Sequence, residues 1–288
     1  MKKREKSAMT AQNISRKLRC PLCHEPVEVR ELKSLVCVNN HTFDFAKQGY
    51  VNILKKSVGT QYDDALFNAR QKIICDEKLY EPVHNKIADI IIKHSAEDSL
   101  LFDAGSGEGS HLQTILDKVN TETLTGIGLD ISKEGILMAA KNYGNPLWIV
   151  GDLANPPLSD KSCKFILNFL SPANYSEFKR ILAEDGIIIK VIPGSGYLKE
   201  LRRELFSDTD GKEYENNDTL ELMKKNVRLV KEERITYTKF LDAAALKDLI
   251  SMTPLGWHAD TAQIERFADK GNKEITVDMH IVLAAAEN

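Results

Sequence analysis

Short apolar runs and helical stretches alternate from Leu100 onward, and this alternation is the feature that most constrains the fold. The apolar runs are LLFDAGS, LTGIGLDIS, PLWIVGD, KFILNFL and GIIIKVIP. Helices are expected near 112–119, 134–142, 175–182 and 197–206, and the chain closes with an expected strand 227–237, helix 242–251 and strand 276–284. Such alternation is typical of an α/β protein with a doubly wound, mainly parallel sheet.

The first apolar run ends in a glycine-rich turn, DAGSGEG, in which Gly105, Gly107 and Gly109 alternate with other residues. This G-x-G-x-G spacing differs from the G-x-G-x-x-G of dinucleotide-binding proteins, and it disfavours a nicotinamide-dependent oxidoreductase. The tighter turn, led by Asp103, suits a smaller cationic ligand. S-adenosylmethionine has a sulfonium and an ammonium group, and we expect Asp103 near the ammonium, directly or through water.

Two further acids end the next two expected strands, Asp130 after GIGL and Asp152 after WIVG. A carboxylate offers two acceptor oxygens, so Asp130 is predicted to accept both ribose hydroxyls. Asp152 is predicted to lie at the adenine, with Leu153 packed on the ring. For any one of these acids, a role as a strand-end cap or a helix N-cap is the alternative. All three follow strands, at the sheet edge where open parallel sheets bind ligands.

Cys20, Cys23, Cys37 and His41 form two close pairs separated by a loop, as in CPLC…CVNNH. This spacing is typical of a tetrahedral zinc site with a closed Cys3His ligand set, which is structural because no position is open for a catalytic water. A disulfide is the alternative. The cysteine total is odd, and the N-terminus has no apolar leader, so a reducing cytoplasmic setting is expected.

Charge is distributed unevenly along the chain, although the net charge is only −3. Residues 1–60 carry +7 and the remainder carries −10. A basic N-terminal region on an acidic body indicates an anionic partner, and a polyphosphate backbone fits best. For the lysines of the first six residues, simple solubility is the alternative. No apolar run is long enough to cross a membrane.

Six motifs together carry a resemblance to a known family: CPLC…CVNNH, TFDFAKQGYVNIL, NARQKIICDEKLYEPV, DAGSGEG, GIGLDIS and SMTPLGWHA. From about residue 18 the chain resembles the RlmA-type bacterial methyltransferases, which modify N1 of a guanine in 23S ribosomal RNA. The resemblance implies a class I methyltransferase with a mixed seven-stranded sheet, S-adenosyl-L-methionine as cofactor and one structural zinc ion. It also implies an rRNA hairpin near the macrolide-binding exit tunnel as target, a link to macrolide resistance, and a homodimer.

Composition and apolar periodicity, together with the resemblance, divide the chain into four segments. The expected segments are a flexible arm 1–17, a zinc-binding RNA-recognition domain 18–56, a helical linker 57–98 and a methyltransferase domain 99–288. A polar stretch at 55–64 is expected to act as a linker, and a charged stretch at 207–218 is expected to be a surface excursion.

The family also implies cofactor contacts beyond the glycine turn. Tyr80 matches a tyrosine that covers the cofactor, and His111 and Leu112 match residues that line the same site. Tyr197, after VIPGSG, is expected to reach the methionine end. Core packing at a domain boundary is the alternative for both tyrosines.

The expected reaction is an in-line displacement at the sulfonium methyl by guanine N1, in which the protein mainly aligns the reactants and excludes water. Asn168 is the candidate for positioning the guanine edge, with Ser171 and Pro172 at the rim. Phe169 or Trp257 is a candidate for stacking on the base, and the acceptor of the N1 proton is not identified. Two other functions stay open: a small-molecule methyltransferase with a purely structural zinc site, and a non-catalytic RNA-binding protein.

Overall fold

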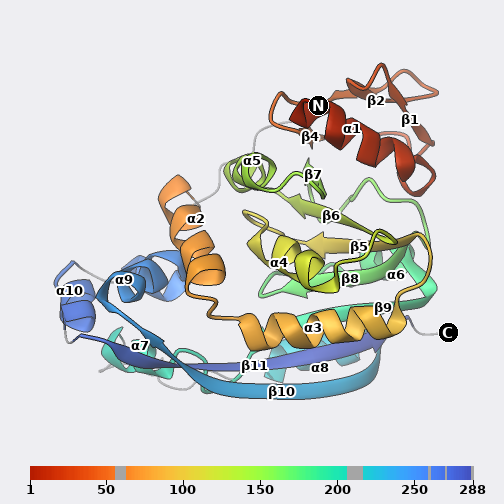
Figure 1. Cartoon of the computed structure of the whole chain (residues 1–288). Helices are drawn as coiled ribbons and strands as arrows, with labels where there is room; N and C mark the ends of the chain where they lie inside the picture. Colours follow the sequence, from red (N-terminus) through yellow and green to blue (C-terminus); the bar gives the residue numbers. More distant parts are fainter. Residues whose placement is uncertain (56–62, 206–216, 259–260, 270, 287–288) are drawn as a thin grey trace.

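A mixed sheet runs through the molecule and organises the other elements around it (Figure 1). The computed structural model describes residues 1–55, 63–205, 217–258, 261–269 and 271–286, so most of the expected linker 55–64 and excursion 207–218 lies outside them. The sheet has eight strands in the order β10-β11-β9-β8-β5-β6-β7-β4. Their bounds are β4 Tyr50–Asn52, β5 Ser99–Ala104, β6 Leu124–Asp130, β7 Leu147–Val150, β8 Cys163–Phe169, β9 Leu182–Pro193, β10 Arg228–Leu241 and β11 Lys273–Ala285.

Strands β4 to β9 pair in parallel, whereas β11 pairs antiparallel with both β9 and β10. The expected doubly wound fold is therefore confirmed, with seven strands from the region after residue 98. The eighth strand, β4, comes from the N-terminal region and pairs in register with β7, Tyr50 opposite Trp148 and Asn52 opposite Val150. In Figure 1 the arrowheads of β5 and β6 point toward the side on which α2 lies.

Helices cover both faces of the sheet, as the continuous burial of β5 and β7 requires. The main helices are α2 Asp64–Gln71, α3 Glu81–His94, α4 Ser110–Val119, α5 Lys133–Asn142, α6 Tyr175–Ile181, α7 Lys199–Leu205, α8 Asn217–Lys224, α9 Ala243–Met252 and α10 Thr261–Asp269. Apolar residues of α3, α4, α5 and α9 pack in one core, and those of α1, α6 and α8 pack in the other. None of the described helices combines the length and apolar character of a membrane span.

The segment expected as a flexible arm instead contains a helix, α1 Lys3–Asn13, followed by a 3-10 turn Ser15–Lys17. The buried face of α1 is made of small side chains, Ser7, Ala8 and Ala11, and it lies against β1 and β7. Such a face lets two backbones approach closely but adds little apolar signal to the sequence. Helix formation here is a consequence of tertiary packing, which overrides the polar composition.

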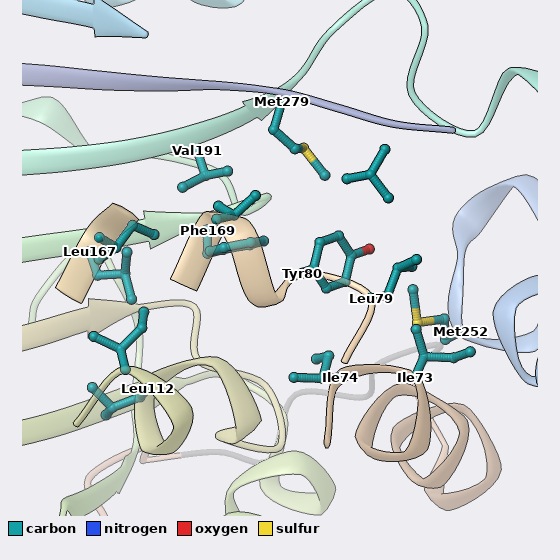
Figure 2. Close-up of a cluster of buried hydrophobic side chains, with 14 of the residues drawn as sticks. Ile73, Ile74, Leu79, Tyr80, Leu112, Leu167, Phe169, Val191, Met252 and Met279 are labelled. Carbon is teal, nitrogen blue, oxygen red and sulfur yellow. The ribbon is translucent and has the colours of Figure 1, made fainter. Parts of the chain in front are cut away.

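The segment expected as a helical linker joins the main core. Helix α2 continues into a π-helical turn Lys72–Asp76, and α3 then runs beside α4. Figure 2 shows Ile73, Ile74 and Tyr80 from this segment packed with Leu167, Phe169 and Met279 of the sheet and Met252 of α9. These residues are buried together, so this segment stabilises the sheet as well as connecting two regions. The proposed division of the chain at 56/57 and 98/99 stays a prediction.

The zinc-binding region folds as a small antiparallel sheet of its own. Its strands are β1 Val27–Arg30, β2 Ser34–Cys37 and β3 Thr42–Asp44, in the order β1-β2-β3. The sequence predicts short strands at 27–30, 34–37 and 42–45, and the three observed strands match these positions within one residue. The chain then turns at 46–49 into β4, so the small sheet is joined directly to the edge of the large one.

Candidate active site and metal centre

Four metal-ligating side chains meet at one end of the small sheet. Cys20 and Cys23 precede β1, Cys37 ends β2, and His41 precedes β3. The Cys23 and Cys37 sulfurs are 3.6 Å apart, and His41 Nδ1 lies 3.5 Å from the sulfurs of Cys20 and Cys37. Zn–S and Zn–N bonds of about 2.3 and 2.0–2.1 Å give tetrahedral edges of about 3.5–3.8 Å. The predicted Cys3His set therefore fits zinc.

Local turns bring these ligands together. Asn40 adopts the left-handed backbone conformation (φ 61°), and its N–H donates to the Cys37 carbonyl, which turns the chain so that His41 faces the cysteines. The Leu22 backbone N–H lies 3.5 Å from the Cys20 sulfur. A hydrogen bond from the Asn39 side chain is the largest of the effects that lower the pKa of Cys23 to about 6, whereas burial raises the pKa of Cys20 to about 11.

The glycine turn lies at the carboxyl end of β5. Gly105, Gly107 and Gly109 all have positive φ, and a side chain on Gly105 would meet the Ser171 hydroxyl. The turn is thus as tight as its sequence predicts, and the loop after β8 closes over it. Asp103, just before the turn, is 1% exposed, and neither carboxylate oxygen has a hydrogen-bond partner in the described residues.

The turn gathers three acidic side chains rather than one. Burial, followed by the charges of Asp130 and Glu108, raises the pKa of Asp103 well above its usual range. Burial also raises the pKa of Asp130 and of Glu108. Asp130 accepts hydrogen bonds from the Gly107 and Ser132 backbone N–H groups, 2.8 Å each, while Glu108 Oε1 and the Ser106 hydroxyl have no partner among the described residues. Buried polar atoms of this kind mark a site for a ligand with donor groups.

Arg70 of α2 is the cation nearest this acidic cluster. Its Nη1 atom lies 3.9 Å from Glu108 Oε2 and 3.0 Å from the position that a Cβ atom on Gly107 would occupy. Its positive charge lowers the pKa values of Glu108 and Asp130 and so opposes the effect of burial on them. The same charge also acts to lower the pKa values of Tyr80 and His111. Sequence reasoning missed Arg70 and Glu108. The signal was present, since Arg70 lies in the NARQ motif and Glu108 lies inside the glycine turn.

An aromatic cluster lies beside the glycine turn. Tyr80 and Tyr197, which the resemblance named, share a hydrogen bond of 2.6 Å between their hydroxyls. His111 stacks on Phe169 at 3.8 Å between ring centroids, and its Nδ1 atom lies 2.8 Å from His84 Nε2. Burial lowers the pKa of His84 to about 3 and that of His111 well below its usual range, so both imidazoles are neutral at pH 7. Phe169 therefore packs within this cluster.

The other predicted site residues fall in different surroundings. Asp152 is exposed at the end of β7, where one oxygen accepts from the Ala154 backbone, and Leu153 is half-buried within reach of Gly105. Leu112 is fully buried in the core of α4 and the sheet (Figure 2). The side chain of Trp257 lies outside the described residues.

The hydrogen-bond partners of the Asn168 side chain all lie within the protein. Its side-chain amide donates to the carbonyls of Ala104 and Pro172, 2.9 Å each, and its oxygen accepts from the Lys190 ammonium. Both amide hydrogens are thus engaged within a fully buried side chain, and the expected contact with a guanine edge is not open to it as placed. Asn168 instead joins β5 to the loop after β8, which carries Ser171 and Pro172. Burial lowers the pKa of Lys190 to about 8.

Comparison with protein families and with curated sequences gives a consistent result. Residues 18–56 match the family model described as "RlmA, N-terminal", a zinc ribbon, and residues 102–189 match the model described as "Methyltransferase domain". The chain is 38% identical to YxjB of Bacillus subtilis (strain 168), assigned as a 23S rRNA (guanine-N(1)-)-methyltransferase, over 92% of this chain and 95% of that protein. It is 30% identical to the 23S rRNA (guanine(748)-N(1))-methyltransferase of Streptomyces fradiae, over 88% and 91% of the two chains.

A solved structure supports the fold at lower similarity. Phosphoethanolamine N-methyltransferase 2 of Haemonchus contortus, in complex with S-adenosyl-L-methionine, superposes with a TM-score of 0.50 at 14% identity, over 80% of this chain and 58% of that one. At this identity the likeness concerns the methyltransferase fold alone.

Proposed function

The chain belongs to the family of 23S rRNA (guanine-N1) methyltransferases with an RlmA-type zinc ribbon, and from this membership we propose that it methylates N1 of a guanine in 23S rRNA. The observation that carries the proposal is the joining, through β4, of a Cys3His ribbon to a sheet whose G-x-G-x-G turn holds buried acidic oxygens with no hydrogen-bond partner among the described residues. The acidic cluster suits a cationic cofactor, and the ribbon suits RNA.

S-adenosyl-L-methionine, when bound, supplies a methyl group activated by its positively charged sulfur. We assign Asp103 to its ammonium group, Asp130 to its ribose hydroxyls, and Asp152 with Leu153 to its adenine. These assignments follow the strand order β5, β6, β7, along which a nucleoside extends in a doubly wound sheet. Unpartnered oxygens on Asp103 support the first assignment, since each can accept an N–H hydrogen bond.

Arg70 fits the carboxylate of the same cofactor. Its guanidinium lies over Gly107 and within 4 Å of Glu108, beside the acid that we assign to the ammonium. A guanidinium presents paired donors that match a carboxylate. The ammonium and the carboxylate of the methionine end would then each face a protein group of opposite charge, Asp103 and Arg70. Tyr80, Tyr197 and His111 form the apolar wall that excludes water beside it.

The target base is assigned to the loop after β8. Leu170 is 39% exposed at a left-handed backbone position, and a cavity of about 440 Å³ opens beside it, lined in part by Ser171, Pro172 and Lys190. A guanine in paired RNA must be turned out of its stack to reach any such loop, and hairpins release bases more readily than continuous duplex does. We therefore propose a hairpin target, near the macrolide-binding exit tunnel as in the family resemblance, reached in the cytoplasm.

Methyl transfer to a 23S rRNA transcript tests this function directly. The purified protein, the transcript and S-adenosyl-L-methionine should yield one methyl group at N1 of a single guanine, identified by mass mapping of nuclease fragments. The Asp103→Asn variant should give much less product at the same cofactor concentration, because the cofactor should bind it more weakly. Absence of transfer to any rRNA fragment, with transfer to a small molecule instead, would favour the small-molecule methyltransferase. A homodimer belongs to the same proposal and is measured by light scattering.

A further inference from the structure

Two classes of cation can be distinguished in and around the N-terminal region. Four cations in and around the zinc ribbon each form an ion pair with a nearby carboxylate. The pairs are Lys17–Asp98 at 2.8 Å, Arg19–Asp160 at 3.5 Å, Arg30–Glu28 at 3.1 Å and Lys33–Glu31 at 2.8 Å. A cation with a carboxylate beside it contributes little field at a distance. These residues therefore account poorly for the attraction of a polyanion.

The second class lines one cavity of about 700 Å³, which we call the basic groove. Its lining residues are Lys2, Lys3, Arg4, Lys47, Gln48 and Lys141. Within the described part of the chain, none of these five cations forms an ion pair with a carboxylate. They come from the start of α1, the turn between β3 and β4, and the last turn of α5, so the groove joins the ribbon to the methyltransferase sheet.

Tertiary contacts hold the start of α1, which carries Lys2, Lys3 and Arg4, against α5 and the turn before β4. The Lys3 ammonium donates to the carbonyl oxygens of Ala140 and Lys141 at the end of α5. The Lys3 backbone packs on Gly49, where a side chain would come within 3.1 Å of the Lys3 carbonyl. The Lys6 ammonium donates to the Asn145 side chain at 2.7 Å. The first residues of the chain thus form one wall of a groove, which argues against the reading of these lysines as a solubilising tail.

We propose that the basic groove binds the phosphate backbone of the rRNA substrate, an inference that rests on the proposed function. Several unneutralised cations set along one groove fit a polyphosphate better than a single small anion, because each neutralised phosphate releases counterions. Helix α5 rises about 12 Å between Lys133 and Lys141, since each residue adds 1.5 Å. The groove therefore lies a helix length from the cofactor acids, and it holds RNA that flanks the target base.

A matched pair of charge reversals tests the groove. The first variant carries Lys47→Glu and Lys141→Glu, both exposed residues of the groove, and the control carries Arg30→Glu and Lys33→Glu in the paired class. The two double variants change net charge by the same amount. Binding of a 23S rRNA transcript is measured at several salt concentrations, together with S-adenosyl-L-methionine affinity and methyl transfer at saturating RNA.

The groove variant should bind the transcript about 10- to 100-fold more weakly. The slope of the logarithm of its binding constant against the logarithm of salt concentration should become shallower by roughly two. Its cofactor affinity and its rate at saturating RNA should match the wild type, and the control should lose less than about 3-fold in RNA affinity. Equal losses in both variants, or no loss in the groove variant, would overturn the groove while wild-type methylation keeps the proposed function. A wild-type protein that neither binds nor methylates the transcript would overturn both.

Discussion

The metal centre and the proposed cofactor site are both clusters of polar side chains, but the chain builds them in opposite ways. The metal ligands lie within 22 consecutive residues, and tight turns place each of the two pairs. The proposed cofactor cluster instead draws Arg70 from α2, Asp103 from β5 and Asp130 from β6, and its aromatic wall draws Tyr197 from beyond β9. One site is local in the sequence, and the other exists only after the sheet has formed.

This difference has a physical consequence for each site. Thiolates and an imidazole held by local turns can bind zinc before the large sheet forms, so the metal contributes directly to the folding of the ribbon. Acidic groups gathered by long-range packing are held in a buried site and close to one another, and burial, followed by the charges of Asp130 and Glu108, raises the pKa of Asp103. The large sheet therefore stabilises the cofactor cluster, whereas the zinc cluster stabilises its own surroundings. The predictions below test this contrast, beginning with the largest effect.

Removal of one zinc ligand should unfold the zinc ribbon and leave the large sheet folded. Cys23→Ser removes one of the four ligands and should abolish zinc binding. The ribbon should then unfold, because a structural zinc site contributes on the order of 10 kcal/mol or more to folding. Amide protection at 18–55 should be lost by hydrogen exchange, and β4 should separate from β7, while β5 and β6 stay protected. Metal content is measured by elemental analysis.

Cys75→Ser is the matched control for that experiment, since Cys75 lies in the main core region and 3.5 Å from the Tyr143 hydroxyl, which a serine can also contact. It should retain zinc and full amide protection. A Cys23→Ser protein that keeps one zinc ion per chain would remove the assigned ligand set. Loss of protection throughout the sheet would show that the two regions fold as one unit.

Replacement of Asp103 should change stability and cofactor affinity in opposite directions. Asp103→Asn removes a buried carboxylate that has no hydrogen-bond partner in the described part of the chain, so the free protein should become more stable. The same change removes the charge assigned to the cofactor ammonium, and S-adenosyl-L-methionine should bind about 100-fold more weakly, since a charged hydrogen bond is worth roughly 1.5–3 kcal/mol. Calorimetry measures both quantities, and Asp117→Asn on the exposed side of α4 is the control.

The pH dependence gives a second measure of Asp103. Its pKa is raised in the folded protein, mainly by burial, so the folded state binds more protons than the unfolded state above pH 3.8. Wild-type stability should therefore fall as pH rises above about 4, and Asp103→Asn should remove that part of the decline. An unchanged pH profile together with unchanged cofactor affinity would contradict the role of Asp103.

Arg70 offers a smaller effect on the same site. Arg70→Gln removes the cation beside Glu108 and should weaken S-adenosyl-L-methionine binding about 10-fold through the loss of one charged contact. A cofactor analogue without the carboxylate should bind both proteins equally, which separates recognition of the carboxylate from a general structural effect. Arg203→Gln on α7, exposed and distant in sequence, is the control. Equal weakening for the cofactor and the analogue would contradict the carboxylate assignment.

The sequence predicts the local parts of this molecule far better than the assembled parts. The zinc ligands, the glycine turn and the strand-end acids follow from spacing within single motifs, and the structure brings the four ligands together. The helix α1 escapes prediction because its buried face is Ser7, Ala8 and Ala11, and β4 escapes because three residues are too few for a periodic signal. The internal bonds of Asn168 depend on three separate loops and strands, which no spacing reveals.

The last and smallest expected effect concerns Asp278 on β11, which ties down the loop that leads to Tyr197. Its carboxylate accepts two bonds from Arg234, both 2.7 Å, and one of 2.8 Å from the Gly196 backbone N–H. The bonds from Arg234 are the main reason that the pKa of Asp278 falls to about 2.

A depressed pKa stabilises the folded protein at pH values above the unfolded value of about 3.8, and that stability is lost as pH falls toward 2. Asp278→Asn should therefore cost about 1 kcal/mol at pH 7, because Arg234 is half exposed and water screens the pair. The cost should shrink between pH 4 and pH 2.

If the long-range assembly of the cofactor site is as described, the variant should also weaken cofactor binding a few-fold through Tyr197, measured by calorimetry. Glu232→Gln, which removes a partner of His280 on the neighbouring strand, should leave cofactor binding unchanged. Equal effects of the two variants on binding would mean that the Gly196 tether does not position Tyr197.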